Sequence, residues 1–302
     1  MAYPAERRKF NPHFLGKALF LCSFHAFADT YYYDDGYLYT MPDQNHAIIF
    51  GVDGDDYSEL NFPEQIHYKW VSAVGIYAFS GDEKVTSVSC ENASRMEKIS
   101  AYAFENCTNL TSAKLTPSIH TIGIGAFEGC TSLSAFDWAN AAVEVISTQA
   151  FYGCTSLTEI EIPDRVTTIE PYAFANCTSL ETVTIGENVT QIADSAFNND
   201  SVLTIACYYD SCAHNFAKAQ NIPYILLDSV LLGDANGDGY VNISDVTDIQ
   251  RAVAEMDTLD DLRKKAADIN GDGVVTIDDA TILQMYLAEF ATDYPIGVVT
   301  AQ

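Results

Sequence analysis

The sequence predicts an α+β fold in two parts, a solenoid of short parallel strands followed by a small all-α module. Two observations predict it. The dipeptide Ala-Phe recurs six times at intervals of 23 to 25 residues, from Phe79 to Phe197. The stretch DANGDGYVNISD at 234–245 then returns 34 positions later as DINGDGVVTIDD. A fixed period of this length indicates stacked repeats, and the duplicated acidic loop indicates a module of two equivalent halves.

Composition excludes several classes of protein. The 302 residues hold 15 basic and 42 acidic side chains, for a formal net charge of −27. Such a charge repels nucleic acid and anionic lipid, so we expect neither as a partner. Hydrophobic residues make up 48% of the chain, too many for a disordered acidic protein. No apolar run reaches the roughly 18 residues of a membrane-spanning helix, so membrane insertion is not expected.

Residues 1–28 have the pattern of a secretory signal peptide. Arg7, Arg8, Lys9 and Lys17 precede the apolar stretch ALFLCSFHAFA, which ends in Ala-Phe-Ala before Asp29. A basic start, a short apolar middle and an A-x-A exit are typical of export signals. The alternative is a buried first helix or strand. We predict export and a mature chain that begins at Asp29.

Each repeat places its apolar residues with a regular spacing. In AFYGCTSLTEIEIPDRVTTIE, from Ala150, the segment LTEIEI alternates like a strand with Ile160 and Ile162 pointing inward. One such unit cannot bury its apolar face alone, so neighbouring units must stack and share a core. The sequence therefore predicts a solenoid with a strip of short parallel strands along one side.

The L-x-x-I-x-I strand and the Ala-Phe-x-x-Cys-Thr-x-Leu turn resemble the BspA-type family of leucine-rich repeats, over about residues 57–227. Residues 29–228 would then form one domain, with an N-terminal hairpin cap and a C-terminal cap of a helix and a closing strand. Two departures are an apparent insertion, HYKW at 67–70, and Trp138 in place of a small aliphatic residue. The resemblance implies binding to a protein or carbohydrate ligand, without naming it.

Cysteines occupy the same position in successive repeats, at Cys107, Cys130, Cys154 and Cys177. Stacked turns hold equivalent side chains about 4.8 Å apart and parallel, whereas a disulfide needs them turned toward each other. We therefore predict free, buried thiols rather than a disulfide or metal ladder. A local pair between Cys207 and Cys212 remains open.

No active site is expected in the repeats. Glu159 and Glu161 are expected to lie about 6.5 Å apart on one strand face, which is close to the separation of the two catalytic carboxylates in an inverting glycosidase. An acid–base pair also needs an apolar neighbour that raises the pKa of one carboxyl above that of the other, and none is near. We interpret them as a solvated acidic patch. The turn at 51–59 imitates a calcium loop but lacks the glycine that the loop requires at position six. Five tyrosines could form a sugar platform or cover the open end of the solenoid: Tyr31, Tyr32, Tyr33, Tyr37 and Tyr39.

The two C-terminal loops carry oxygen ligands at alternate positions, a glycine at position six and a carboxylate at position twelve. This pattern suits a hard cation with six to eight ligands, so we predict two Ca²⁺ ions rather than magnesium or zinc. The main chain supplies the ligand at position seven. The predicted ligands are Asp234, Asn236, Asp238, Tyr240 and Asp245 in the first loop, and Asp268, Asn270, Asp272, Val274 and Asp279 in the second.

Amphipathic helices follow the loops at 246–256 and 280–290, with a middle helix within 257–268 and none immediately before the first loop. This order departs from an ordinary EF-hand, which needs a helix on both sides of its loop, and it resembles a type I dockerin over 231–291. The resemblance implies a docking module rather than a calcium sensor or buffer. We assign 229–295 to the dockerin and 296–302 to a tail. The resemblance implies a cohesin partner on a scaffoldin, contacted through Ile243, Ser244, Arg251, Ala252, Ile277, Asp278, Met285 and Tyr286.

Together these features predict a secreted, extracellular, non-catalytic subunit of a bacterial cell-surface cellulosome. Two alternatives stay open at this point. One is a polysaccharide-active enzyme whose site lies on the repeat domain, and the other is a cell-surface adhesin that the dockerin merely attaches.

Overall fold

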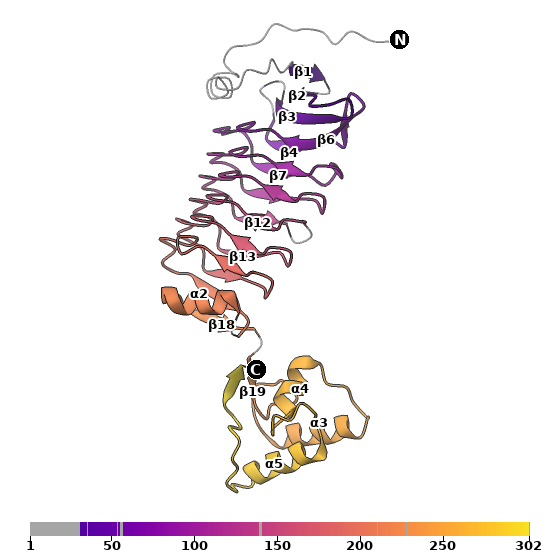
Figure 1. The fold of residues 1–302 in the computed structure, drawn as a ribbon, viewed down its shortest axis with the longest axis vertical. Helices are drawn as coiled ribbons and strands as arrows, with labels where there is room; N and C mark the ends of the chain where they lie inside the picture. Colours follow the sequence, from indigo (N-terminus) through magenta and orange to yellow (C-terminus); the bar gives the residue numbers. More distant parts are fainter. Residues whose placement is uncertain are drawn as a thin grey trace. The chain divides into compact units, whose positions relative to one another are not determined.

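The computed structural model describes residues 31–301 except Asp35, Asp53, Asp55, Asp56, 139–140, Asp210 and Asp228. The predicted signal peptide and three acidic residues of the 51–59 turn, Asp53, Asp55 and Asp56, therefore lie outside the described residues. The chain divides into two compact units. The first comprises the described residues through Cys207 with Ser211–Tyr224, and the second comprises Ile225 onward with Tyr208 and Tyr209. Figure 1 shows a stack of strands in the first unit and short helices in the second.

The first unit is a solenoid in which most turns contribute two short strands. One strip consists of two-residue strands stacked in parallel, with Ile99, Ile122, Ile146, Ile169 and Ile192 in register. These isoleucines are buried or nearly so, because each points from its strand into the shared core. The strands are β8 (Lys98–Ile99), β10 (Thr121–Ile122), β12 (Val145–Ile146), β14 (Thr168–Ile169) and β16 (Gln191–Ile192).

The second strip is the one that the alternation LTEIEI predicts, and Ile160 is buried between exposed Glu159 and Glu161. It does not form one sheet. One sheet has the order β11-β9-β7-β4 and another the order β13-β15-β17-β18, without pairing between β11 and β13. The strands are β4 (Glu59–Asn61), β7 (Ser87–Ser89), β9 (Ser112–Lys114), β11 (Ala135–Asp137), β13 (Glu159–Glu161), β15 (Thr182–Thr184), β17 (Thr204–Cys207) and β18 (Tyr224–Leu226).

Two large rings cause this interruption. Phe136 and Trp138 occupy the inward positions that Ile160 and Ile162 hold in the next turn. The Phe136 ring meets Phe127 and Phe151 edge-on, with centroids 5.0 and 4.7 Å apart. Rings of this size need more room than the aliphatic side chains of neighbouring turns. The two strands therefore separate, an effect that we did not predict for Trp138.

A column of phenylalanines fills the core. Phe104, Phe127, Phe151 and Phe174 are buried, and successive rings stack with centroids 5.2 to 5.7 Å apart. The regular repeat length holds each ring above its equivalent in the next turn. Dispersion contacts along such a column stabilise the stack of turns.

The cysteine column confirms the predicted packing, because Cys107, Cys130, Cys154 and Cys177 are free and buried. Each thiol donates a hydrogen bond to the main-chain carbonyl of the repeated phenylalanine in the preceding turn, for example Cys130 Sγ to Phe104 O at 3.1 Å. Burial raises the pKa of Cys107 to about 12. Cys212, at the start of the cap helix, is also a free thiol, so it forms no local disulfide.

The two ends of the solenoid are covered. At the N-terminal end β1 (Tyr31–Asp34), β2 (Tyr37–Thr40) and β3 (His46–Val52) form an antiparallel meander. The apparent insertion HYKW consists of the two-residue hairpin turn His67–Tyr68 and the first two residues of β6 (Lys69–Val74), which pairs with β5 (Gln65–Ile66). His67 and Tyr68 have the left-handed conformation that a tight hairpin requires. At the other end, α2 (Cys212–Gln220) begins at the N-cap Ser211 and β18 adds a closing strand.

The second unit contains β19 (Ser229–Leu231), α3 (Ile243–Val253), α4 (Asp261–Ala267), α5 (Ile277–Leu287) and β20 (Val299–Ala301). Helices α3 and α5 pack against each other. Their shared core includes Val246, Ile249, Ala280 and Leu283. Among the described residues, no helix has the length and apolar character needed to cross a membrane.

The segment 296–302, which we expected to be a tail, takes part in this core. Ile296 is buried, and β20 pairs antiparallel with β19. Gly297 N also donates to Leu232 O at 2.8 Å. The chain end therefore closes the module by joining its first strand. The apolar run from Ile296 to Val299 is the sequence signal for this strand.

Candidate metal-binding loops and docking face

The first acidic loop is organised around two carboxylates. Asp234 accepts hydrogen bonds from the main-chain N–H groups of Gly237 and Gly239, at 2.9 and 2.8 Å. Asp245, at position twelve, accepts from Asn236 N and Asn242 N at 3.1 and 2.8 Å. The loop can curl this tightly because Gly239 has a φ of +85°, a conformation that favours glycine.

The second loop repeats this network. Asp268 accepts from Gly271 N and Gly273 N at 3.0 and 2.8 Å. Asp279 accepts from Asn270 N and Thr276 N at 3.2 and 2.8 Å. The carboxylate at position twelve also caps the helix that follows. Asp245 forms a capping box with Asn242 at the start of α3, and Asp279 forms one with Thr276 at the start of α5. Each predicted metal site is thus tied to the start of a helix.

Burial makes these carboxylates costly without a cation. Asp245 and Asp279 are fully buried, and Asp234 and Asp268 are 7% and 8% exposed. Burial, with the charges of Asp234 and Asp238 adding to it, raises the pKa of Asp245. Two ion pairs of this unit join Arg251 to Asp257 and Lys264 to Asp261, and neither includes a carboxylate of the two loops. A bound divalent cation would offset this charge, so the donor set fits a metal.

Carboxylates alone do not complete a site. Within the described residues, no three His, Cys, Asp or Glu side chains come together as a metal-binding group. Asn236 Nδ2 donates to Asp238 Oδ2 at 3.1 Å, and Asp238 Oδ1 accepts from Tyr240 N at 2.9 Å. An ion would therefore have to turn these side chains inward. The side chain of Tyr240 is 74% exposed, which agrees with a contribution from its main chain only.

The residues predicted to meet a partner are mostly exposed. Ile243 and Ile277 stand at the first positions of α3 and α5, with 63% and 52% of each side chain exposed. The two halves therefore expose an apolar side chain at the same position of their helices, where a partner could contact it. Ser244, Asp278, Met285 and Tyr286 are exposed as well, whereas Ala252 is half-buried.

Sequence reasoning missed a link between the first loop and α4. The Arg263 guanidinium donates from Nε to Ala235 O at 2.9 Å, which ties α4 to the second residue of the loop. A lone arginine in a charged helix carries no signal for such a contact, because only the packing of α4 decides its direction.

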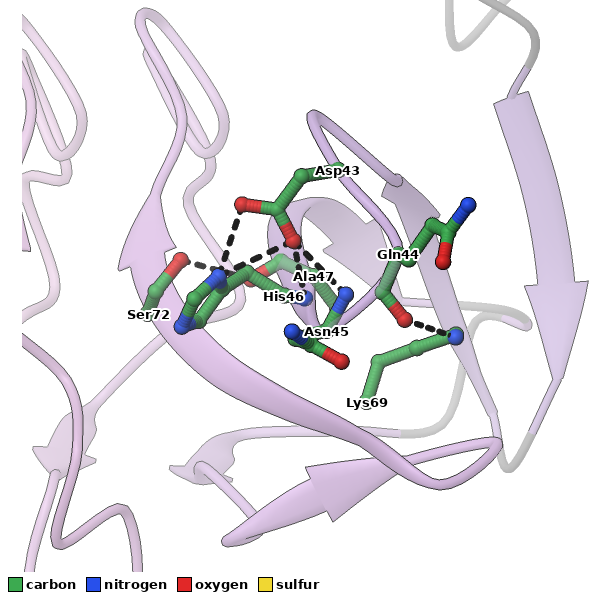
Figure 2. Close-up of polar contacts among 7 residues, drawn as sticks. All are labelled: Asp43, Gln44, Asn45, His46, Ala47, Lys69 and Ser72. Carbon is green, nitrogen blue, oxygen red and sulfur yellow. Dashed lines mark hydrogen bonds and ion pairs between the residues drawn. The ribbon is translucent and has the colours of Figure 1, made fainter.

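A polar cluster near the N-terminal end was also missed (Figure 2). Asp43 Oδ1 accepts from Asn45 N and His46 N at 2.7 and 2.9 Å, and His46 Nδ1 lies 2.8 Å from Asp43 Oδ2. The hydrogen bond from the His46 side chain, followed by that from Asn45 N, lowers the pKa of Asp43. Lys69 donates to Gln44 O from the neighbouring β6. These contacts fix the turn that leads into β3, and the sequence Pro-Asp before it is the available signal.

The tyrosines of the N-terminal hairpin cover the core where they are described. Tyr39 is buried, and its ring faces Tyr32 with centroids 5.7 Å apart. Tyr37 donates from its hydroxyl to Asn61 O at 2.9 Å, and burial raises its pKa. The side chains of Tyr31 and Tyr33 lie outside the described residues.

The fold and the paired loops define a leucine-rich repeat solenoid joined to a module of two acidic loop–helix halves. The chain carries a BspA type leucine rich repeat region and a dockerin type I domain: the first family model matches residues 72–204 in six copies, and the second matches residues 232–288. Both are non-catalytic kinds of domain, and dockerin type I domains bind calcium. A search of curated proteins found no match.

Solved structures similar to this chain include several bacterial leucine-rich repeat proteins. A leucine rich cell surface protein from Faecalibacterium prausnitzii is 23% identical, with 61% of this chain and 56% of that chain covered and a TM-score of 0.47. The leucine rich repeat protein of T. pallidum is 22% identical, with 63% and 95% covered and a TM-score of 0.47. One from Eubacterium ventriosum is 19% identical, with 57% and 50% covered and a TM-score of 0.45. The chain thus spans only about half of the first and third of these proteins.

Proposed function

We propose that this protein is an exported, non-catalytic subunit of a cellulosome-type assembly. Its dockerin docks onto a cohesin domain of a scaffoldin, and its repeats hold a protein or glycan ligand at the cell surface. The observation that carries this proposal is the duplication of the loop–helix half. The same acidic loop, the same hydrogen bonds and the same capping box occur twice, at an offset of 34 residues. A sensor or buffer would not require an exposed isoleucine at the start of both helices.

Calcium has a structural role in this proposal. One ion in each loop is held by the carboxylates at positions one, five and twelve, the asparagine at position three and the carbonyl at position seven. The ion replaces repulsion between buried carboxylates by attraction, and its binding energy becomes folding energy. The docking face formed by α3 and α5 therefore depends on both ions.

The experiment is capture of the full-length protein by immobilised cohesins, in calcium and in EGTA. We expect capture by at least one cohesin in calcium and loss of capture in EGTA. The variant Asp234→Ala/Asp268→Ala should also lose capture. The matched control is Asp261→Ala/Asp293→Ala, which removes the same charge at exposed positions and should bind normally. Capture that survives both EGTA and the loop variant would contradict the calcium-dependent role.

Export has a separate test. Mass spectrometry of protein recovered from culture medium should place the N-terminus at Asp29. An intact Met1 on secreted material would contradict removal of a signal peptide, without bearing on the dockerin.

A further inference from the structure

The interrupted strip of the repeat unit leaves two strand edges facing each other. Elsewhere in this strip a main-chain N–H joins successive turns just after their strands, as from Leu115 N to Asp137 O at 2.8 Å and from Ile162 N to Thr184 O at 2.9 Å. At the interruption a side chain makes the equivalent contact instead, from Trp138 Nε1 to Glu161 O at 2.8 Å. The indole thus bridges β11 and β13 while the strands remain unpaired.

Two adjoining hollows open at this interruption. The smaller, of about 190 Å³, lies between the strands and is lined by Phe136, Asp137, Trp138, Glu161, Ile162, Pro163 and Asp164. The larger, of about 450 Å³, extends from Phe136 and Asp137 across β9 and β7. Because a water takes about 30 Å³ of liquid, the smaller hollow has the volume of about six waters, enough for one long side chain.

The smaller hollow combines an apolar floor with an acidic rim. Phe136 is half-buried at its base, and Asp137, Glu161 and Asp164 are exposed at its edge. No basic side chain is among its lining residues. The larger hollow contains one cation, Lys114, whose Nζ lies 2.7 Å from Glu91 and 3.9 Å from Asp137. Its charge is therefore shared between Glu91 and Asp137, whereas Glu161 and Asp164 pair with no cation among the residues that line either hollow.

We infer that this cleft binds a basic side chain, Lys or Arg, from an extended segment of a partner protein. The aliphatic stem would lie against Phe136, and the cationic head would meet the three carboxylates. The main chain of the segment has room along the larger hollow, because Ser87, Ser112 and Ala135 are small there. This inference rests on the binding role proposed for the repeats and assigns it a chemical class of partner.

The same geometry disfavours a sugar. Carbohydrates stack on the open face of an aromatic ring. Trp138 is only 3% exposed. The Phe136 ring meets Phe127, Trp138 and Phe151 edge-on, at interplanar angles of 81°, 88° and 87°. Trp138 therefore offers no open face to a sugar, and only part of the half-buried Phe136 ring is exposed. A cation needs only the carboxylates and a short apolar wall.

The test uses the full-length protein and a fluorescein-labelled peptide, Gly-Ser-Arg-Gly-Arg-Gly-Arg-Ser-Gly, with fluorescence polarisation in EGTA and in calcium. We expect saturable binding that is independent of calcium. An analogue with citrulline in place of arginine keeps the shape without the charge, and should bind at least about tenfold more weakly. In the protein, Asp137→Asn/Asp164→Asn should weaken binding at least about fivefold. The matched control Glu144→Gln/Glu187→Gln removes two exposed charges elsewhere on the repeats and should change it less than about twofold.

Several outcomes would overturn the inference. Equal weakening by both pairs of substitutions would mean attraction to the acidic surface in general. Equal binding of the citrulline peptide would remove the role of charge, and displacement of the peptide by cellohexaose would indicate a sugar site instead. A second variant, Phe136→Val/Trp138→Ile, places the residue types of neighbouring turns in the cleft and should abolish binding by closing it. If that variant does not fold, the paired charge substitutions still decide. Cohesin capture, measured in parallel, should be unchanged in each variant, so failure here stays distinct from failure of the proposed docking.

Discussion

Asp200 occupies the position that cysteine holds in four earlier turns, three residues after the repeated phenylalanine. There the four thiols each donate a hydrogen bond to a phenylalanine carbonyl. An ionised carboxylate can only accept, and neither Asp200 oxygen has a hydrogen-bond partner although both are buried. Burial raises the pKa of Asp200 to about 8. The substitution is visible in the sequence, but the missing partner is visible only in the structure.

This carboxyl should make the stability of the repeats depend on pH. Its folded pKa lies above the unfolded value of about 3.9, so the folded state holds the proton more tightly. The free energy of unfolding should therefore fall as pH rises from about 4 to about 8, by at most about 1.4 kcal/mol per pH unit and less with solvent screening. Asp200→Asn should remove this slope and stabilise the unit at pH 8 by about 1–3 kcal/mol.

Urea unfolding at pH 5 and pH 8, followed by tryptophan fluorescence, measures this difference. The method reports on the repeats alone, because Trp70 and Trp138 are the only tryptophans of the chain. Asp194→Asn is the control, since Asp194 is exposed. An unchanged slope in Asp200→Asn would show that the carboxyl is satisfied by water.

Gly239 and Gly273 illustrate a second effect of single residues. Their φ values are +85° and +86°, and a Cβ on either would meet no atom within 4 Å. The cost of alanine is therefore conformational, about 1–2 kcal/mol per site, and not steric. We expect Gly239→Ala/Gly273→Ala to weaken calcium binding by roughly ten-fold or more per site, measured by calorimetry. Gly186→Ala, at an ordinary φ with only Asp164 Oδ1 nearby at 3.8 Å, should leave it unchanged.

At the scale of elements, the repeats could be predicted because their period fixes which residues face inward. The register of Ile146 with Ile169 follows from the spacing alone. The strip of two-residue strands could not be predicted, because two residues are too few to show an alternation of apolar and polar side chains. The separation of β11 from β13 depends on the shapes of Phe136 and Trp138, which a pattern of apolar positions treats like any other apolar residue.

The helices of the second unit should depend on calcium, whereas the repeats should not. Asp245 and Asp279 link each loop to the cap of α3 or α5, so repulsion within a loop acts directly on a helix. Removal of calcium by EGTA should lower the far-UV helical signal of the full chain, and added calcium should restore it. Tryptophan fluorescence of the repeats should stay constant throughout. A helical signal that is unaffected by EGTA would contradict this coupling.

At the scale of the whole molecule, the loops and their helices could be predicted because their ligand spacing is strict, and the two halves share it. What could not be predicted is how the module closes. Ile296 belongs to its core and β20 pairs with β19, a contact between residues about seventy positions apart. Only tertiary packing brings these two ends together.

The internal repeat gives the module an approximate twofold symmetry, which bears on how it docks. A half-turn would carry Ile243 onto Ile277, and both are exposed at the first position of their helices. Other equivalent positions differ between the halves. Arg251 Nη2 lies 3.8 Å from Asp257, whereas its counterpart Met285 is uncharged. Tyr286, the counterpart of Ala252, has its hydroxyl close to Gly297, where an added Cβ would lie 3.1 Å from it. We expect the isoleucines to dominate, since buried apolar anchors carry most of an interface's energy.

The module should then bind a cohesin in two orientations. Ile243→Asp alone and Ile277→Asp alone should each cost less than about threefold in affinity, because the intact half still docks and the lost alternative is worth only a factor of about two. An aspartate at the first position of a helix is compatible with folding, since it complements the helix dipole. The double variant should lose at least about a hundredfold, a non-additive result that calorimetry with the captured cohesin would measure. Met256→Asp is the control, because Met256 is 73% exposed but lies beyond the end of α3. If one single variant abolishes binding and the other has no effect, the module docks in one orientation only.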